Sequence, residues 1–151
     1  MDTNELHKHL IEAERLCSQR EYCVQEIRTK LKAKGATLEE AEQVIKRLIQ
    51  GDFLNEPRYT RAFVHDKSNL QGWGPEKIRF ALRARQIPDN VIGNALAEID
   101  THASKEKLRR LLAIKRRSLK TGSETEIRSK LIRFGLSRGF SYRDVLCSLE
   151  E

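Results

Sequence analysis

The sequence has few of the residues that form membrane spans, disulfide frameworks or aromatic pockets. Aromatic residues make up 6% of the 151 positions, and no apolar run approaches the roughly 20 residues that span a bilayer. The polar N-terminal residues lack the basic and then apolar pattern of a secretory signal. Cys17, Cys23 and Cys147 cannot all pair within the chain and lack the spacing of metal ligands. We therefore expect a protein of the reducing cytoplasm, with free thiols and no membrane partner.

Signs of catalysis are also few. The four histidines are His7, His9, His65 and His102. His7 and His9 are two positions apart, which places them on different faces of a helix and disfavours a shared metal ion. No glycine-rich phosphate loop follows a strand, because period-two strand patterns are missing. We predict a protein that is not an enzyme and needs neither a cofactor nor a metal.

Helical periodicity extends along nearly the whole sequence. Apolar residues recur at three- and four-residue spacing in nine segments, which short connections separate. Several segments begin with a capping box, in which a hydroxyl and a carboxylate satisfy free backbone N–H groups. The pairs are Thr37 with Glu40, Ser123 with Glu126, and Ser141 with Asp144. The seventh segment, residues 101–120, is the longest. We predict an all-α protein of nine helices.

A five-residue pattern divides these helices into thirds. Ile-Arg-x-x-Leu occurs three times, at intervals of 51 and 49 residues: Ile27 to Leu31, Ile78 to Leu82 and Ile127 to Leu131. A second apolar cluster follows each copy at a similar distance, with one residue inserted around positions 136–139 of the third copy. Three such copies predict an internal repeat. We expect three tandem three-helix repeats, at residues 1–51, 52–100 and 101–151, which stack into an array with an extended surface.

Excess positive charge is confined to the last third. Residues 101–151 hold 13 basic and 6 acidic side chains, whereas each of the two preceding thirds is balanced. The seventh segment carries the main candidates for contact with a partner or with DNA: Arg109, Arg110, Lys115, Arg116 and Arg117. Two interpretations remain open. These residues form either a solvated charged face or a surface that meets nucleic-acid phosphates or an acidic protein.

The repeated arginines also have two possible roles. Arg28, Arg79 and Arg128 each follow the isoleucine of the pattern, about 100° further around the helix, and Arg83 lies one turn after Arg79. In the favoured interpretation their methylene stems cover the edge of the core while the guanidinium groups stay in water. In the alternative they line one continuous face and contact an acidic partner.

The aromatic residues are expected mostly in the core, at helical positions: Tyr59, Phe63, Phe80, Phe134 and Phe140. Trp73 is different, because it lies between Gly72 and Gly74. It either fills the junction between two repeats, which is the favoured interpretation, or is exposed as an anchor for a partner.

The segment Phe53–Val64 resembles the signature of the RecX family, regulators of the bacterial RecA recombinase. The residues that carry this resemblance are Leu54, Asn55, Glu56, Arg58, Tyr59 and Phe63. The glycines around Trp73 and the following Ile78 continue it, and it extends over about the whole chain, most weakly after residue 101. Gln86 departs from the pattern, because the family often has glycine before the isoleucine that corresponds to Ile87. The conformation of this turn is therefore an open question.

The resemblance implies a curved, elongated molecule that lies in the helical groove of the RecA–single-stranded-DNA filament. There it would inhibit ATP hydrolysis, strand exchange and coprotease activity, and so act in DNA recombination, DNA repair and the SOS response. We expect it to be a monomer. Two alternatives remain: a general basic helical DNA-binding protein that acts without a recombinase, and an adaptor that binds another protein through Trp73 and the arginine rows.

Overall fold

The protein is α-helical throughout the part that this computed structural model describes, residues 3–150. That range contains no strand, and its nine α-helices and one π-helical turn confirm the predicted all-α class. The elements are α1 Thr3–Gln19, α2 Val24–Ala33, α3 Leu38–Gln50, α4 Glu56–His65, η1 Asp66–Leu70, α5 Pro75–Ala84, α6 Asp89–Ala97, α7 Thr101–Ser118, α8 Glu124–Ser137 and α9 Tyr142–Leu149.

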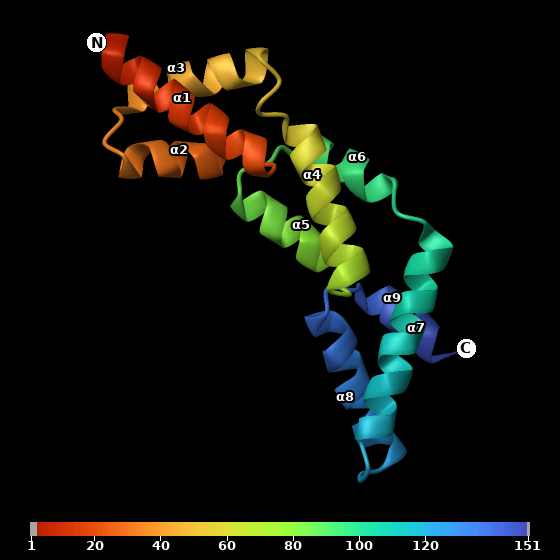
Figure 1. Ribbon diagram of the computed structural model, residues 1–151. Helices are drawn as coiled ribbons and strands as arrows, with labels where there is room; N and C mark the ends of the chain where they lie inside the picture. The colour runs from red at the N-terminus through yellow and green to blue at the C-terminus, as the bar shows by residue number, and fades with distance from the viewer. Residues whose placement is uncertain (1–2, 151) are drawn as a thin grey trace.

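The helices pack in three groups, which we call units 1, 2 and 3. Helices α1–α3 pack together in unit 1, α4–α6 with η1 in unit 2, and α7–α9 in unit 3. Figure 1 shows that the units follow one another along a curved and elongated path, with the N-terminus at one end and the α7–α8 hairpin at the other. The second helices of the units, α2, α5 and α8, lie along the same side of this path.

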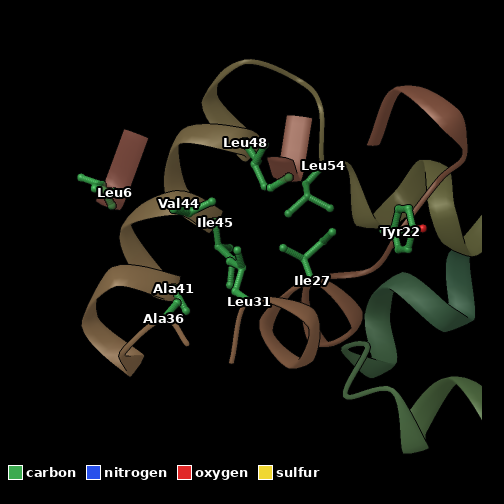
Figure 2. Close-up of a cluster of buried hydrophobic side chains, with 11 residues drawn as sticks. Leu6, Tyr22, Ile27, Leu31, Ala36, Ala41, Val44, Ile45, Leu48 and Leu54 are labelled. Carbon is green, nitrogen blue, oxygen red and sulfur yellow. The ribbon is translucent and has the colours of Figure 1, made fainter. Parts of the chain in front are cut away.

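Each unit has its own apolar core. In unit 1, Ile27 and Leu31 of α2 meet Ile45 and Leu48 of α3, as Figure 2 shows. Each of these side chains is at most 4% exposed, and burial of one such side chain stabilises the fold by about 1.5–3 kcal/mol. The other cores form in the same way around Ile78 and Leu82 in unit 2 and around Leu108, Leu112 and Leu131 in unit 3.

One turn, between the second and third helix, is the same in all three units. A residue with left-handed backbone lies two positions after the end of the second helix: Gly35 (φ 92°), Gln86 (φ 61°) and Gly139 (φ 97°). The N–H of the next residue then donates to the carbonyl oxygen five positions earlier, with N···O distances of 3.0–3.2 Å, from Ala36 to Leu31, from Ile87 to Leu82 and from Phe140 to Gly135. Gln86 therefore keeps the turn that glycine makes in the other units. Because it has a Cβ, this conformation costs it about 1–2 kcal/mol.

The shared turn shows that the third copy of Ile-Arg-x-x-Leu is out of register with the other two. Helix α8 has 14 residues, whereas α2 and α5 have 10. Counted back from the turn, Leu131 corresponds to Ile27 and Ile78. Leu131 is fully buried, and Ile127 is only partly buried. The expected insertion of one loop residue is therefore wrong, because the third unit instead contains an extra turn of helix.

The expectation that the aromatic residues lie in the core is wrong for Phe80, which is 77% exposed. Helix α5 turns Ile78 and Leu82 towards the core. Phe80 is two residues from each of them, so it projects from the opposite face of the helix. Phe140 and Tyr59 are buried as expected.

We predict that Gln86→Gly will raise the free energy of unfolding by about 0.5–1 kcal/mol, because glycine adopts the left-handed conformation without strain. Chemical denaturation measures this change. Gln86→Ala is the control, since it removes the same side chain but keeps the Cβ. The explanation fails if the two variants have equal stability.

The shifted register predicts different costs for two isoleucines at the same position of the sequence pattern. Ile78→Ala and Leu131→Ala should each lower the free energy of unfolding by about 2–5 kcal/mol, because both leave a cavity in a closed core. Ile127→Ala should cost clearly less, since Ile127 is only partly buried. Urea unfolding of the three variants tests the register, and equal losses for Ile78→Ala and Ile127→Ala would contradict it.

Candidate functional site

The signature segment is the junction between units 1 and 2. Leu54 is 2% exposed and belongs to the core of unit 1, whereas Tyr59 is 6% exposed and belongs to the core of unit 2. Cys23, which precedes α2, crosses in the opposite direction and is fully buried in the core of unit 2. Each of these two short segments thus buries a side chain in the core of the neighbouring unit. This packing restrains the angle between the units.

Polar groups of the same segment complete this junction. Asn55 caps α4, because its Oδ1 accepts a hydrogen bond of 2.9 Å from the backbone N–H of Arg58. The Glu56 Oε2 accepts the backbone N–H of Val24 at 3.2 Å, which fixes the start of α2 against α4. The guanidinium of Arg58 reaches Glu21 at 2.7 Å and Asp52 at 3.1 Å. The residues of the signature therefore join the two units.

The pKa values in this region follow from those contacts. The Asn55 amide and the Arg58 guanidinium hold the pKa of Asp52 below its ordinary value. Burial raises the pKa of Tyr59 to about 12, so its hydroxyl stays neutral. Burial also raises the pKa values of the Cys17 and Cys23 thiols. Both thiols stay protonated near neutral pH and are therefore poor nucleophiles.

Units 2 and 3 meet through backbone groups. The Gly74 N–H donates to the carbonyl of Arg138 at 2.6 Å, and the Glu76 N–H donates to the carbonyl of Gly139 at 2.8 Å. The φ of Gly74 is −82°, which any residue adopts. A Cβ at this position would nevertheless lie 2.6 Å from the backbone nitrogen of Phe140. Only glycine therefore allows these two backbone segments to approach each other this closely.

Lys107 of α7 strengthens the junction between units 2 and 3. Its ammonium donates to the Ser68 carbonyl at 2.7 Å and to the Asn69 Oδ1 at 3.0 Å. Both acceptors belong to residues of η1. Burial lowers the pKa of Lys107, and the nearby Arg110 charge lowers it further. A cleft of about 480 Å³, lined in part by Ser68 and Lys107, lies beside this contact.

Trp73 lies next to this junction. Its ring packs partly buried against the core of unit 2 and meets Phe63 edge to face, with ring centroids 6.4 Å apart. The neighbouring Gly72 has a φ of 68° and lies close to the guanidinium of Arg138, which donates to the Gln71 carbonyl. The indole is therefore held by unit 2 and is neither fully enclosed nor fully exposed.

The three candidate arginines of units 1 and 2 have carboxylate partners. The Arg28 Nε lies 2.6 Å from a Glu42 oxygen, a contact that raises the pKa of Arg28 and lowers that of Glu42. On α5, Arg79 pairs with Glu76 at 2.7 Å, and Arg83 pairs with Asp89 at 3.0 Å. These pairs neutralise much of the charge that an acidic partner would meet.

Several cations of unit 3, unlike these arginines, have no carboxylate partner among the described residues, although Arg109 does. Arg109 pairs with Glu106 at 2.5 Å. Within residues 3–150, four other candidates form no ion pair: Arg110, Arg116, Arg117 and Arg128. Lys115 lies over the ring of Phe134, with its Nζ 5.4 Å from the centroid.

A shallow groove in unit 3 brings together Lys115 of α7 and two cations of α8, Lys130 and Arg133, around the Phe134 ring. The sequence-based candidates did not include Lys130 and Arg133. Their spacing of three residues places them on one side of a helix, but only the pairing of α7 with α8 brings Lys115 to the same groove.

The family models that match this chain correspond to units 1 and 2. Residues 12–48 match the family model for the first three-helix domain of RecX, and residues 55–96 match that for the second. The chain is 31% identical to the regulatory protein RecX of Prosthecochloris aestuarii over 132 residues, which cover 87% of this chain and 85% of the relative. The chain belongs to the RecX family.

Other RecX proteins agree with this assignment. The regulatory protein RecX of Clostridium botulinum strain Eklund 17B is 36% identical over 119 residues, which cover 78% of this chain and 55% of the relative. The crystal structure of RecX from Lactobacillus salivarius superposes with a TM-score of 0.90 over 99% of this chain and 97% of that chain, at 22% identity. The last comparison concerns the fold alone.

No helix in residues 3–150 is long and apolar enough to cross a membrane. The same residues contain no group of three or more histidine, cysteine, aspartate or glutamate side chains that could hold a metal ion.

We predict that Gly74→Ala will lower the free energy of unfolding by about 1–3 kcal/mol, because the added methyl group forces the two backbones apart. Gly93→Ala is the control. Gly93 lies in α6, nothing lies within 4 Å of its position for a Cβ, and alanine there should stabilise the helix by about 1 kcal/mol. Thermal unfolding distinguishes them, and equal or reversed effects would contradict the close backbone contact.

Proposed function

We propose that this protein binds the RecA–single-stranded-DNA filament in its helical groove and inhibits ATP hydrolysis, strand exchange and coprotease activity. It acts as a regulator without catalysis of its own, as a cytoplasmic monomer in DNA recombination, DNA repair and the SOS response. Membership of the RecX family supports this proposal, since the relatives are named regulatory proteins.

The observation that carries the proposal is the curved path of the three units (Figure 1). An array of this kind presents an extended surface, and a helical filament repeats the same groove from subunit to subunit. Contacts made by two or three units then act together, so the whole molecule binds more tightly than any single unit. Hydrogen bonds and ion pairs at the junctions restrain the orientation of the units relative to one another.

We assign the strongest electrostatic contact to unit 3. Arg110, Arg116, Arg117 and Arg128 are free of ion pairs within residues 3–150, so they can meet filament DNA or an acidic face of the recombinase without breaking contacts inside the protein. Arg28, Arg79 and Arg83 are weaker candidates. Each would have to leave a carboxylate at 2.6–3.0 Å before binding a partner.

The experiment adds the purified protein to a RecA–single-stranded-DNA ATPase assay. We expect inhibition at or below one protein per recombinase subunit. Unchanged ATP hydrolysis at that ratio would refute the proposed function.

A triple variant then tests the surface of unit 3. Lys115→Gln, Arg116→Gln and Arg117→Gln together should weaken inhibition and reduce its salt dependence by about 2 in the log–log slope if each cation meets one phosphate. Lys30→Gln, Lys32→Gln and Lys34→Gln form the matched control, because they remove the same charge from exposed positions of unit 1. Circular dichroism should give the same helix content for all three proteins. Equal losses in the two triple variants would count against a special role for unit 3.

The second candidate is a general nucleic-acid-binding protein that needs no recombinase. The cations without ion pairs in unit 3 favour it over the adaptor hypothesis. Tight, salt-dependent binding of DNA by the protein alone, with no effect on the recombinase, would support this alternative. Inhibition that is insensitive to the triple variant would instead support a protein adaptor.

A further inference from the structure

A cluster of cations and aromatic rings in unit 2 takes no part in the contacts proposed above. The Nζ atoms of Lys67 and Lys77 lie 4.8 and 4.5 Å from the centroid of the Trp73 ring. Lys67 also lies 5.4 Å from the Phe63 centroid, and the Arg85 guanidinium lies 4.8 Å from it. We call Lys67, Trp73 and Lys77 the Trp73 site.

The backbone holds the Trp73 site in place. The Trp73 N–H donates to the carbonyl of Lys67 at 2.9 Å, which fixes the loop against η1. Lys77 lies in the first turn of α5, two residues after Pro75. The site therefore exists before any ligand arrives, so binding would cost little ordering of the chain.

The two lysines of the site carry unbalanced charge. Within residues 3–150, neither Lys67 nor Lys77 forms an ion pair with a carboxylate. Both ammonium groups lie close to the same indole ring, so their charges repel each other. The negative face of an aromatic ring offsets part of this repulsion, and an anion that contacts both lysines would remove more of it.

The position of Lys77 indicates which anion fits. Lys77 packs against Gly139, where a Cβ would lie 2.8 Å from the Lys77 backbone nitrogen. Gly139 lies two residues after the end of α8, the helix that carries Lys130 and Arg133 to the basic groove of unit 3. A series of cations that continues from one unit into the next suits the evenly repeated phosphates of a nucleic-acid strand.

We propose that the Trp73 site binds phosphates of a single-stranded nucleic acid, whose backbone continues along α8 to the basic groove of unit 3. The binding needs no recombinase, so the inference goes beyond the proposed function and can be tested separately from it.

Trp73 is the single tryptophan of the chain, so its fluorescence reports on this site directly. We expect a saturable change in fluorescence when a short oligothymidylate is added to the 151-residue protein at low salt. Lys67→Gln with Lys77→Gln should weaken binding on the order of tenfold, and should lower the log–log salt slope by about 1.4, the value for two phosphates of a single strand. Lys67→Arg with Lys77→Arg should keep the affinity, because it keeps both charges.

The matched control is Lys30→Gln with Lys32→Gln, which removes two charges from unit 1, one of them 5.8 Å from the Tyr22 centroid. Its affinity for labelled oligothymidylate, measured by fluorescence anisotropy, should stay close to that of the unchanged protein. Equal losses in both glutamine pairs, or binding without any change in Trp73 fluorescence, would overturn the proposal.

Two other anions test the identity of the ligand. Inorganic phosphate that saturates the fluorescence change at the same phosphate concentration would indicate an isolated anion site and overturn the nucleic-acid assignment. Polyglutamate of equal charge that binds more tightly than oligothymidylate would indicate an acidic protein partner and overturn it as well.

Discussion

Neighbouring units of this protein are held together by groups that cross from one unit into the next. A core built by about fifty residues is marginal by itself, and here each junction adds contacts that a lone unit would lack. Leu54 is buried in the core of unit 1, and Cys23 is buried in that of unit 2. Between units 2 and 3 the crossing groups are backbone atoms around Gly74 and Gly139, together with the Lys107 and Arg138 side chains. The curved path in Figure 1 depends on these two junctions.

The two junctions differ in chemistry, and so does the sequence signal that each leaves. Units 1 and 2 are joined by side chains, among them the ion pair of Arg58 with Glu21 and the buried Leu54. Of these, Arg58 and Leu54 belong to the recognisable RecX signature. Units 2 and 3 are joined by glycines that allow close backbone approach, a much weaker pattern. The signature therefore identifies an architecture, and our proposals place partner contacts elsewhere, on the cations of unit 3 and around Trp73.

Much of the fold could be predicted because it depends on local spacing. Apolar residues three and four apart and caps such as Thr37 and Ser141 lie within a few residues of one another. The candidate site was harder to predict from the sequence. Arg28 and Glu42 are 14 residues apart, and nothing in their spacing shows that they pair. The same limit hid Lys130 and Arg133, whose groove forms only where α7 packs on α8.

The sequence by itself determined the helices, the N-cap residues Thr37, Ser123 and Ser141, the threefold organisation and the family, since each of these rests on neighbouring residues or on recurring motifs. Of the three predicted capping boxes, the structure forms both hydrogen bonds only at Thr37 and Glu40. Only the tertiary structure decided the register of the third unit, because an extra turn of α8 moves Leu131 into the core without disturbing the Ile-Arg-x-x-Leu spelling. It also decided which cations are neutralised and which are free. Those outcomes depend on contacts between helices that are far apart in the chain, and a one-dimensional pattern does not record them.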